Sequence, residues 1–182
     1  MRASRAVPTF TPPTLETERL RLRPFASDRS DADALAHVLG DPVAMRWYPA
    51  PFDRDATDQW VQRQLERYAT DGIGLLAIED RATGEVLGDC GPMFQEVDGE
   101  RFLELGWHVL RARQGHGVAT EAGSACRDWA FSVAREPFLI SLIRPENVAS
   151  WRVAEKLGFE IWRGTIRADW GHLVYRLDRP AD

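Results

Sequence analysis

The chain has 182 residues, of which 44% are hydrophobic and 28% charged. This is the composition of an ordinary soluble globular protein, and the length favours one domain with a substantial core. Its 28 acidic residues outnumber 23 basic ones, which gives a net charge of −5. The charge excludes a nucleic-acid binder that depends mainly on phosphate contacts. It weakly favours a cationic partner, although the local pattern of charge matters more than the total.

The cysteines predict neither a disulfide nor a metal site, and the apolar residues predict neither a signal peptide nor a membrane span. Cys90 and Cys126 lie far apart without a CxxC partner, so we expect two small buried residues, no disulfide framework and no metal. The first twenty residues lack the apolar stretch of a signal peptide, and no run approaches the roughly 20 residues of a membrane span. We expect a cytoplasmic monomer or homodimer without membrane or nucleic-acid partners. Its proline-rich residues 1–14 should form a flexible arm before a single domain, residues 15–182.

The first third of the chain predicts one strand and two helices. In residues 18–25, Leu20 and Leu22 alternate with arginines, which is typical of a strand with one wet face. Residues 28–39 and 55–68 carry apolar side chains at helical spacing.

The middle of the chain predicts three antiparallel strands, at 74–80, 85–94 and 101–110, with a tight turn at Asp98-Gly99. Strand residues alternate between two faces of a sheet. One face of the third strand should present Leu103, Leu105, Trp107 and Val109, and the other Glu104, Gly106, His108 and Leu110.

The last third predicts a helix over 118–133, a buried strand at 137–143, a helix over 147–157 and a closing hairpin over 159–179. The expected fold is therefore α/β (α+β), with a mixed, mostly antiparallel sheet of about seven strands and about four helices on its faces. The chain lacks the regular alternation of a doubly wound fold.

The stretch "RARQGHGVATEA", residues 111–122, places two glycines just before a helix. A helix N-terminus is a natural anion site, and Gly115 and Gly117 would let backbone N–H groups approach a phosphate closely. A plain glycine-rich turn is the alternative. The Walker pattern lacks its lysine here, and Thr120 replaces the third glycine of a dinucleotide fingerprint.

The spacing Gln114-Gly115-His116-Gly117-Val118-Ala119 resembles the pyrophosphate loop of the GNAT superfamily of acyl-CoA-dependent N-acetyltransferases. A second segment, residues 144–164, resembles the other acetyl-CoA motif of that family, with Asn147 beginning a helix and "KLGF" ending it. The strand "ELGWHVL" and the opening "LETERLRLRPF" resemble the RimJ/RimL-like branch. The resemblance runs from about residue 15 to residue 177.

The resemblance implies a GNAT-like fold that uses acetyl-CoA as acyl donor and no metal. The acetyl group would pass to a primary amine, either a protein N-terminal α-amine or a small-molecule amine, by direct attack in a ternary complex. The length of the acyl group and the acceptor stay open. By resemblance, the cofactor-binding residues are Val109, Leu110, Gln114, Gly115, His116, Gly117, Val118, Ala119, Thr120, Asn147 and Ser150.

Catalytic roles follow from the resemblance with one departure. Many family members have a tyrosine as general acid where this chain has Ala154, so Ser150 is the nearest hydroxyl in the motif that could protonate the leaving thiolate. Glu104 is the first candidate for the base that takes the proton from the amine, and His108 the second. The backbone N–H near Val109 is expected to stabilise the oxyanion.

The acceptor is expected to contact Trp47, Tyr48, Glu104 and His108, with His37 and Phe52 in the same region. Two other functions remain possible at this stage. One is a non-catalytic acyl-CoA-binding or regulatory module with the same fold, and the other is a different nucleotide-binding protein.

Overall fold

The computed structural model describes residues 11–181, so residues 1–10 of the predicted N-terminal arm lie outside the described part. Within residues 11–181, no helix is long and apolar enough to cross a membrane. The elements in chain order are β1 (Leu15–Glu16), β2 (Leu20–Arg23), α1 (Ser30–Leu39), α2 (Arg54–Thr70), β3 (Leu76–Asp80), β4 (Val86–Val97), β5 (Glu100–Val109), the short 3₁₀ helix η1 (Arg111–Arg113), α3 (Val118–Val133), β6 (Phe138–Ile143), α4 (Val148–Lys156), β7 (Glu160–Arg167) and β8 (Trp170–Asp178).

The strands form one sheet in the order β1-β2-β3-β4-β5-β6-β8-β7. Every neighbouring pair is antiparallel except β5 and β6, which run parallel. All seven predicted strands are present, and the predicted fold class is confirmed. The sheet has eight strands rather than seven because residues 15–16 pair with Arg21 and Leu22. A two-residue strand is too short to show a period-two pattern in the sequence.

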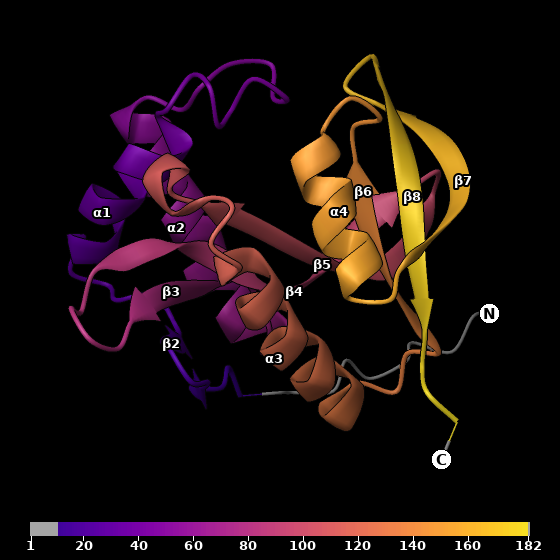
Figure 1. The fold of residues 1–182 in the computed structure, drawn as a ribbon, viewed down its shortest axis with the longest axis horizontal. Helices are drawn as coiled ribbons and strands as arrows, with labels where there is room; N and C mark the ends of the chain where they lie inside the picture. The colour runs from indigo at the N-terminus through magenta and orange to yellow at the C-terminus, as the bar shows by residue number, and fades with distance from the viewer. Residues whose placement is uncertain (1–10, 182) are drawn as a thin grey trace.

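The four helices divide between the two faces of the sheet (Figure 1). Helices α3 and α4 pack with Leu103, Leu105 and Val109 of β5 in the larger core cluster. Helices α1 and α2 form a second cluster on the opposite face, with Ala77 of β3 and Met93 of β4 among the sheet residues. The two faces predicted for β5 are therefore confirmed, and its even-numbered residues face the α1–α2 side.

Strands β5 and β6 stay paired over a very short distance. Only Glu104 and Ile140 are aligned as backbone partners between them. Beyond this point the backbone N–H of Leu142 donates to the Glu104 carboxylate at 3.2 Å, so a side chain takes the place of a strand partner. The sheet therefore opens between the C-terminal ends of β5 and β6.

The register of β5 directs backbone donors into this opening. The N–H of Leu110 donates to the Leu87 carbonyl on β4 at 2.7 Å. In an antiparallel ladder, successive N–H groups point to opposite sides of the strand. The N–H of Val109 is therefore directed away from β4 and toward β6.

Gly88 lies where β4 approaches this part of β5 most closely. The pairing of β3 with β4 skips Leu87, which marks a bulge, and Gly88 follows with φ +152°. A Cβ atom at Gly88 would lie 2.0 Å from the His108 carbonyl oxygen. Only glycine fits here without moving the backbone that carries His108.

We predict that Gly88→Ala lowers the free energy of unfolding by about 2–4 kcal/mol, because backbone displacement adds to the strain of the positive φ. Gly84→Ala is the matched control. Gly84 also has a positive φ, of +75°, but an added Cβ there would meet nothing within 4 Å, so we expect a loss of about 1 kcal/mol. Urea unfolding of both variants measures the difference, and equal losses would contradict the steric account.

Candidate active site

The glycine loop turns the chain from β5 into α3. Gly115 and Gly117 have φ of +78° and +82°, and Gly117 is the N-cap of α3. No side chain caps this helix, so its first N–H groups are left for a ligand. The amide of Gln114 donates to the Val109 carbonyl at 3.0 Å, which ties the loop to the end of β5.

The start of the domain holds the loop from the other side. Arg19 donates to the His116 carbonyl at 3.0 Å and forms an ion pair with Glu121 in the first turn of α3, at 2.6 Å. The Thr17 hydroxyl donates to the same carboxylate at 2.6 Å. The backbone of the loop is thereby fixed in place.

A cavity of about 370 Å³ lies between this loop and the start of α4. Nine of the predicted cofactor residues line it: Val109, Gln114, Gly115, Gly117, Val118, Ala119, Thr120, Asn147 and Ser150. Arg113, Arg152 and Lys156 also line it. Arg46 lines it too, and Arg113 is ion-paired with Glu85 at 2.8 Å. Uncapped helix N–H groups beside these basic side chains match the chemistry of a pyrophosphate, so the residues fit the phosphate end of acetyl-CoA.

Two predicted cofactor residues do not line this cavity. Leu110 packs against the core cluster of α1 and α2, because its side chain shares the face of the even-numbered residues of β5, while its N–H is bonded to the Leu87 carbonyl of β4. The His116 side chain is exposed, and its ring nitrogen Nδ1 lies 3.0 Å from the Gln114 carbonyl.

The second motif forms a capped helix, as predicted. Asn147 is the N-cap of α4, and its side chain accepts the Ser150 N–H at 3.3 Å. Gly158 ends the helix with φ +93°, and the N–H of Phe159 returns to the Ala154 carbonyl. Both caps fix the ends of α4, the helix that carries Ser150.

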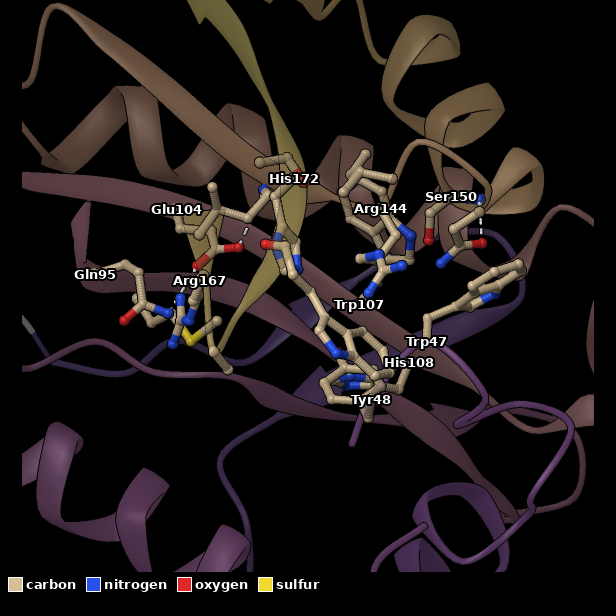
Figure 2. A pocket seen from close by; sticks show the side chains of 18 of the residues that line it. Trp47, Tyr48, Gln95, Glu104, Trp107, His108, Arg144, Ser150, Arg167 and His172 are labelled. Carbon is tan, nitrogen blue, oxygen red and sulfur yellow. Dashed lines mark hydrogen bonds between the residues drawn. The ribbon is translucent and has the colours of Figure 1, made fainter. Parts of the chain in front are cut away.

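A second cavity, of about 560 Å³, lies on the α1–α2 side of the opening (Figure 2). It contains all four predicted acceptor residues, Trp47, Tyr48, Glu104 and His108, and also Phe52. His37 is exposed on α1 and lines neither cavity.

The two cavities share a set of lining residues. A group that crossed from one cavity to the other would pass these side chains, so they mark the place where a donor and an acceptor can meet. The shared residues are Trp47, Tyr48, Trp107, His108, Asn147 and Ser150.

Glu104 lies in the second cavity alone, at the point where β5 and β6 part. It is only 6% exposed, and it accepts hydrogen bonds from the Leu142 N–H and from the Gln95 amide at 3.2 Å. Burial raises the pKa of its carboxyl above the usual range, against the opposing effects of the Leu142 hydrogen bond and of Arg167. In Figure 2, Glu104, Gln95 and Arg167 lie together, away from Ser150 and Trp47.

His108 belongs to a hydrogen-bonded chain. The Trp60 indole donates to Asp89 at 2.8 Å, His108 Nδ1 lies 2.6 Å from the other Asp89 oxygen, and His108 Nε2 lies 2.6 Å from the Tyr48 hydroxyl. Burial on its own would lower the pKa of His108, but the Tyr48 oxygen and the Asp89 carboxylate outweigh it and raise the pKa to about 10.

The protonation state of His108 follows from the burial of its partner. Asp89 is 0% exposed, and a fully buried carboxylate needs a cation beside it. The imidazolium therefore donates to Asp89 through Nδ1 and to Tyr48 through Nε2. This leaves the hydroxyl hydrogen of Tyr48 free to donate into the cavities.

Comparison with known proteins decides the family. The family described as "Acetyltransferase (GNAT) domain" matches residues 19–160. The YkkB protein of Bacillus subtilis (strain 168) is 37% identical over 153 residues, which cover 84% of this chain and 88% of that protein. The chain belongs to the GNAT family of N-acetyltransferases.

Solved structures share its fold. The acetyltransferase from Agrobacterium tumefaciens (strain C58) has a TM-score of 0.79 and 36% identity, covering 92% of this chain and 95% of that one. RimL, a ribosomal L7/L12 α-N-protein acetyltransferase solved with coenzyme A, has a TM-score of 0.71 and 18% identity. That likeness covers 91% of this chain and 97% of RimL, and it shows the fold alone.

Several residues of the acetyltransferase's two cavities escape motif reasoning. Asp89, the buried partner of the cavity residue His108, was missed as well, although a lone carboxylate between Gly88 and Cys90 in an otherwise buried strand is a usable signal. Trp60 and the arginines of the larger cavity carry no such signal, because ordinary amphipathic helices and edge strands also contain them.

We predict that Asp89→Asn lowers the pKa of His108 from its raised value of about 10, because burial still disfavours the imidazolium while the carboxylate that stabilises it is lost. NMR titration of the imidazole, assigned with a His108→Gln variant, measures this shift. In the wild-type acetyltransferase the ion pair stabilises the fold fully below about pH 6.5, and this contribution is lost as the pH rises through about 10.

The exposed carboxylate of Asp128 provides the control, since it pairs with Arg127 on the surface of α3. Asp128→Asn should leave the His108 titration unchanged. An unaltered His108 pKa in Asp89→Asn would show that the buried ion pair is absent.

Proposed function

We propose that this GNAT N-acetyltransferase moves the acetyl group of acetyl-CoA to a primary amine by direct attack in a ternary complex. The observation that carries the proposal is the junction of two cavities at the opening between β5 and β6. One cavity has the donor set for pyrophosphate, and the other contains a buried carboxylate. The acceptor amine belongs to a small molecule or to the N-terminus of a peptide.

When bound, acetyl-CoA supplies an activated thioester. The amine nitrogen forms a bond to the acetyl carbonyl carbon, the bond from that carbon to sulfur breaks, and one proton leaves the nitrogen while the thiolate sulfur gains one. The enzyme must accept the first proton, donate the second and stabilise the negative charge on the carbonyl oxygen.

Glu104 is the proposed base, acting directly or through a water molecule. Its raised pKa lets it accept a proton near neutrality. His108 is a poor base at neutral pH because Asp89 keeps it protonated. The Val109 N–H, directed into the opening, is the proposed oxyanion donor.

Ser150 is the proposed donor of a proton to the thiolate, since it lines both cavities and is fixed by the Asn147 cap. The demand on this group is modest because a thiol has a pKa near ~8.5. The hydroxyl of Tyr48 is a second candidate at the same junction, and it is hydrogen-bonded to His108.

The direct test incubates the enzyme with acetyl-CoA and a panel of α-amines, alkyl amines, polyamines and aminoglycosides. Release of free CoA thiol reports transfer, and mass spectrometry of the product reports the acetylated nitrogen. Thiol release with at least one amine class is expected. Stable acetyl-CoA binding without amine-dependent thiol release from any class would contradict the proposal and favour a non-catalytic acyl-CoA-binding module.

Two substitutions separate cofactor binding from chemistry. Gly117→Val should raise the KM for acetyl-CoA at least about tenfold, because a β-branched residue resists the positive φ and blocks backbone approach to a phosphate. It should also reduce the roughly 2.7 kcal/mol of stabilisation expected at a hundredfold excess of acetyl-CoA over Kd. Ser150→Ala should instead lower kcat roughly tenfold at nearly unchanged acetyl-CoA affinity.

Gly99→Val is the control for backbone strain, because Gly99 has φ +79° in the distant β4–β5 hairpin and an added Cβ there meets nothing within 4 Å. It should leave the KM for acetyl-CoA unchanged. A folded Gly117→Val enzyme with the wild-type KM would refute the phosphate loop. A wild-type kcat in Ser150→Ala would assign the proton to Tyr48 or to unaided departure.

We further predict that Glu104→Gln lowers kcat/KM for a high-pKa amine by about 10²–10⁴-fold near neutrality, since glutamine cannot accept the proton. Part of the loss should be recovered at higher pH, where the neutral amine is more abundant. Glu100→Gln, an exposed change on the same strand, should keep the wild-type profile. A uniform reduction at every pH would show that Glu104 acts only by supporting the opening of the sheet.

A further inference from the structure

The acceptor cavity contains a cluster of arginines that the transfer chemistry does not use. Its members come from α2, from the residue after β6 and from the end of β7. Arg167 lies beside Glu104, whereas Arg144 lies on the side of the cavity nearer Ser150 (Figure 2). No carboxylate other than that of Glu104 lines this cavity in the described part of the chain. The members of this arginine cluster are Arg63, Arg67, Arg144 and Arg167.

The positive charge of the arginine cluster is largely uncompensated. Within residues 11–181, Arg63, Arg67 and Arg167 have no carboxylate within 4.0 Å, whereas most arginines on the surface are paired. Arg67 donates to the neutral Gln64 side chain and to the Met93 sulfur. Arg144 has an exposed ion pair through Nε at 3.3 Å, but its buried Nη1 has no hydrogen-bond partner.

The arginines also act on one another. Burial lowers the pKa of Arg67, and the neighbouring Arg63 lowers it further. Burial likewise lowers the pKa of His172, with Arg144 and Arg167 adding to the effect. Arg67 and Arg144 are half-buried, whereas Arg63 and Arg167 are exposed at the mouth of the cavity. An anion bound in the cavity would offset the cost of burying the first two and the repulsion among all four.

Glu104 does not account for the cluster. Its two oxygens accept from the Leu142 N–H and the Gln95 amide, and no arginine lies within 4.0 Å of it. A direct ion pair would lower the pKa of Glu104, whereas burial keeps that pKa raised. One carboxylate would in any case leave most of the positive charge unmatched.

Two of these guanidinium groups lie over aromatic rings. Arg144 lies over the Trp170 ring at 4.1 Å, and Arg63 lies over the Trp60 ring at 5.3 Å. Stacking occupies the flat face of a guanidinium and leaves the N–H groups at its edge available. Such edges bind carboxylate and phosphate oxygens through paired, charge-assisted hydrogen bonds.

We propose that the acceptor is an anionic amine, whose carboxylate or phosphate binds to the arginine cluster while its primary amine lies beside Glu104. This inference rests on the proposed function and narrows its acceptor. It reverses the weak expectation of a cationic partner that the net charge of −5 raised, because the cavity has the opposite sign to the protein as a whole. Polyamines and aminoglycosides are then poor acceptors.

The test compares amines that differ only in a remote anionic group. For the carboxylate arm, 4-(aminomethyl)benzoate is compared with 4-(aminomethyl)benzamide. For the phosphate arm, tyramine O-phosphate is compared with tyramine, and spermidine represents the cationic amines. Thiol release from acetyl-CoA gives kcat/KM, and thermal melting in the presence of CoA gives binding without turnover.

We expect at least one anionic amine to exceed its neutral partner by about 10–100-fold in kcat/KM, as charge-assisted hydrogen bonds to arginine require. Arg167→Gln and Arg67→Gln should remove most of this preference, so that the ratio of kcat/KM between the anionic amine and its neutral partner falls toward one. Arg135→Gln removes the same charge from an exposed position outside both cavities, and it should keep the preference.

The outcomes separate the two proposals. Equal or better use of the neutral amines or of spermidine would overturn the anionic acceptor and leave the acetyltransferase activity standing. A preference that survives in both cavity variants would overturn it as well. If no amine releases thiol, the proposed function fails. In that case the melting shifts still decide the anion site, because anionic amines should stabilise the wild-type protein more than Arg167→Gln, and equal shifts would refute it.

Discussion

The hydrogen bond from the Leu142 N–H to the Glu104 carboxylate marks the point on which the rest of the site depends. At this point β5 and β6 stop pairing as strands, and a side chain satisfies the first backbone donor that pairing would have used. If β5 and β6 stayed paired along their full length, the sheet would separate the cavities on its two faces completely. Because it opens here, the cavity beside the glycine loop on the α3 side and the larger cavity on the α1–α2 side share lining residues.

Local signals were strong enough to predict most of the fold and the cofactor side. Alternating Leu20 and Leu22, the Asp98-Gly99 turn and the capped helix at Asn147 all depend on neighbours within a few residues. The glycine loop likewise combines a backbone conformation and a helix start that lie within six residues. A pattern of this kind is visible in the sequence because the physics that causes it is local.

The acceptor side could not be predicted in the same way. The Trp60–Asp89–His108–Tyr48 chain and the arginine cluster join residues from α2, β4, β5 and β7 that are far apart in sequence. Leu110 is a residue that the local sequence pattern assigned wrongly to the lining of the cofactor cavity. It lies between strand and loop, and only the pairing of β4 with β5 decides that it packs in the core rather than beside the cofactor.

The central claim is that acyl transfer takes place at the opening between β5 and β6. A crystal structure of the complex with CoA tests it most directly. We expect the pyrophosphate at the Gln114–Gly117 loop and the sulfur of CoA between the strands, in contact with Ser150 and facing the Val109 N–H. A sulfur that lies outside this opening, with β5 and β6 closed over the junction of the two cavities, would contradict the account.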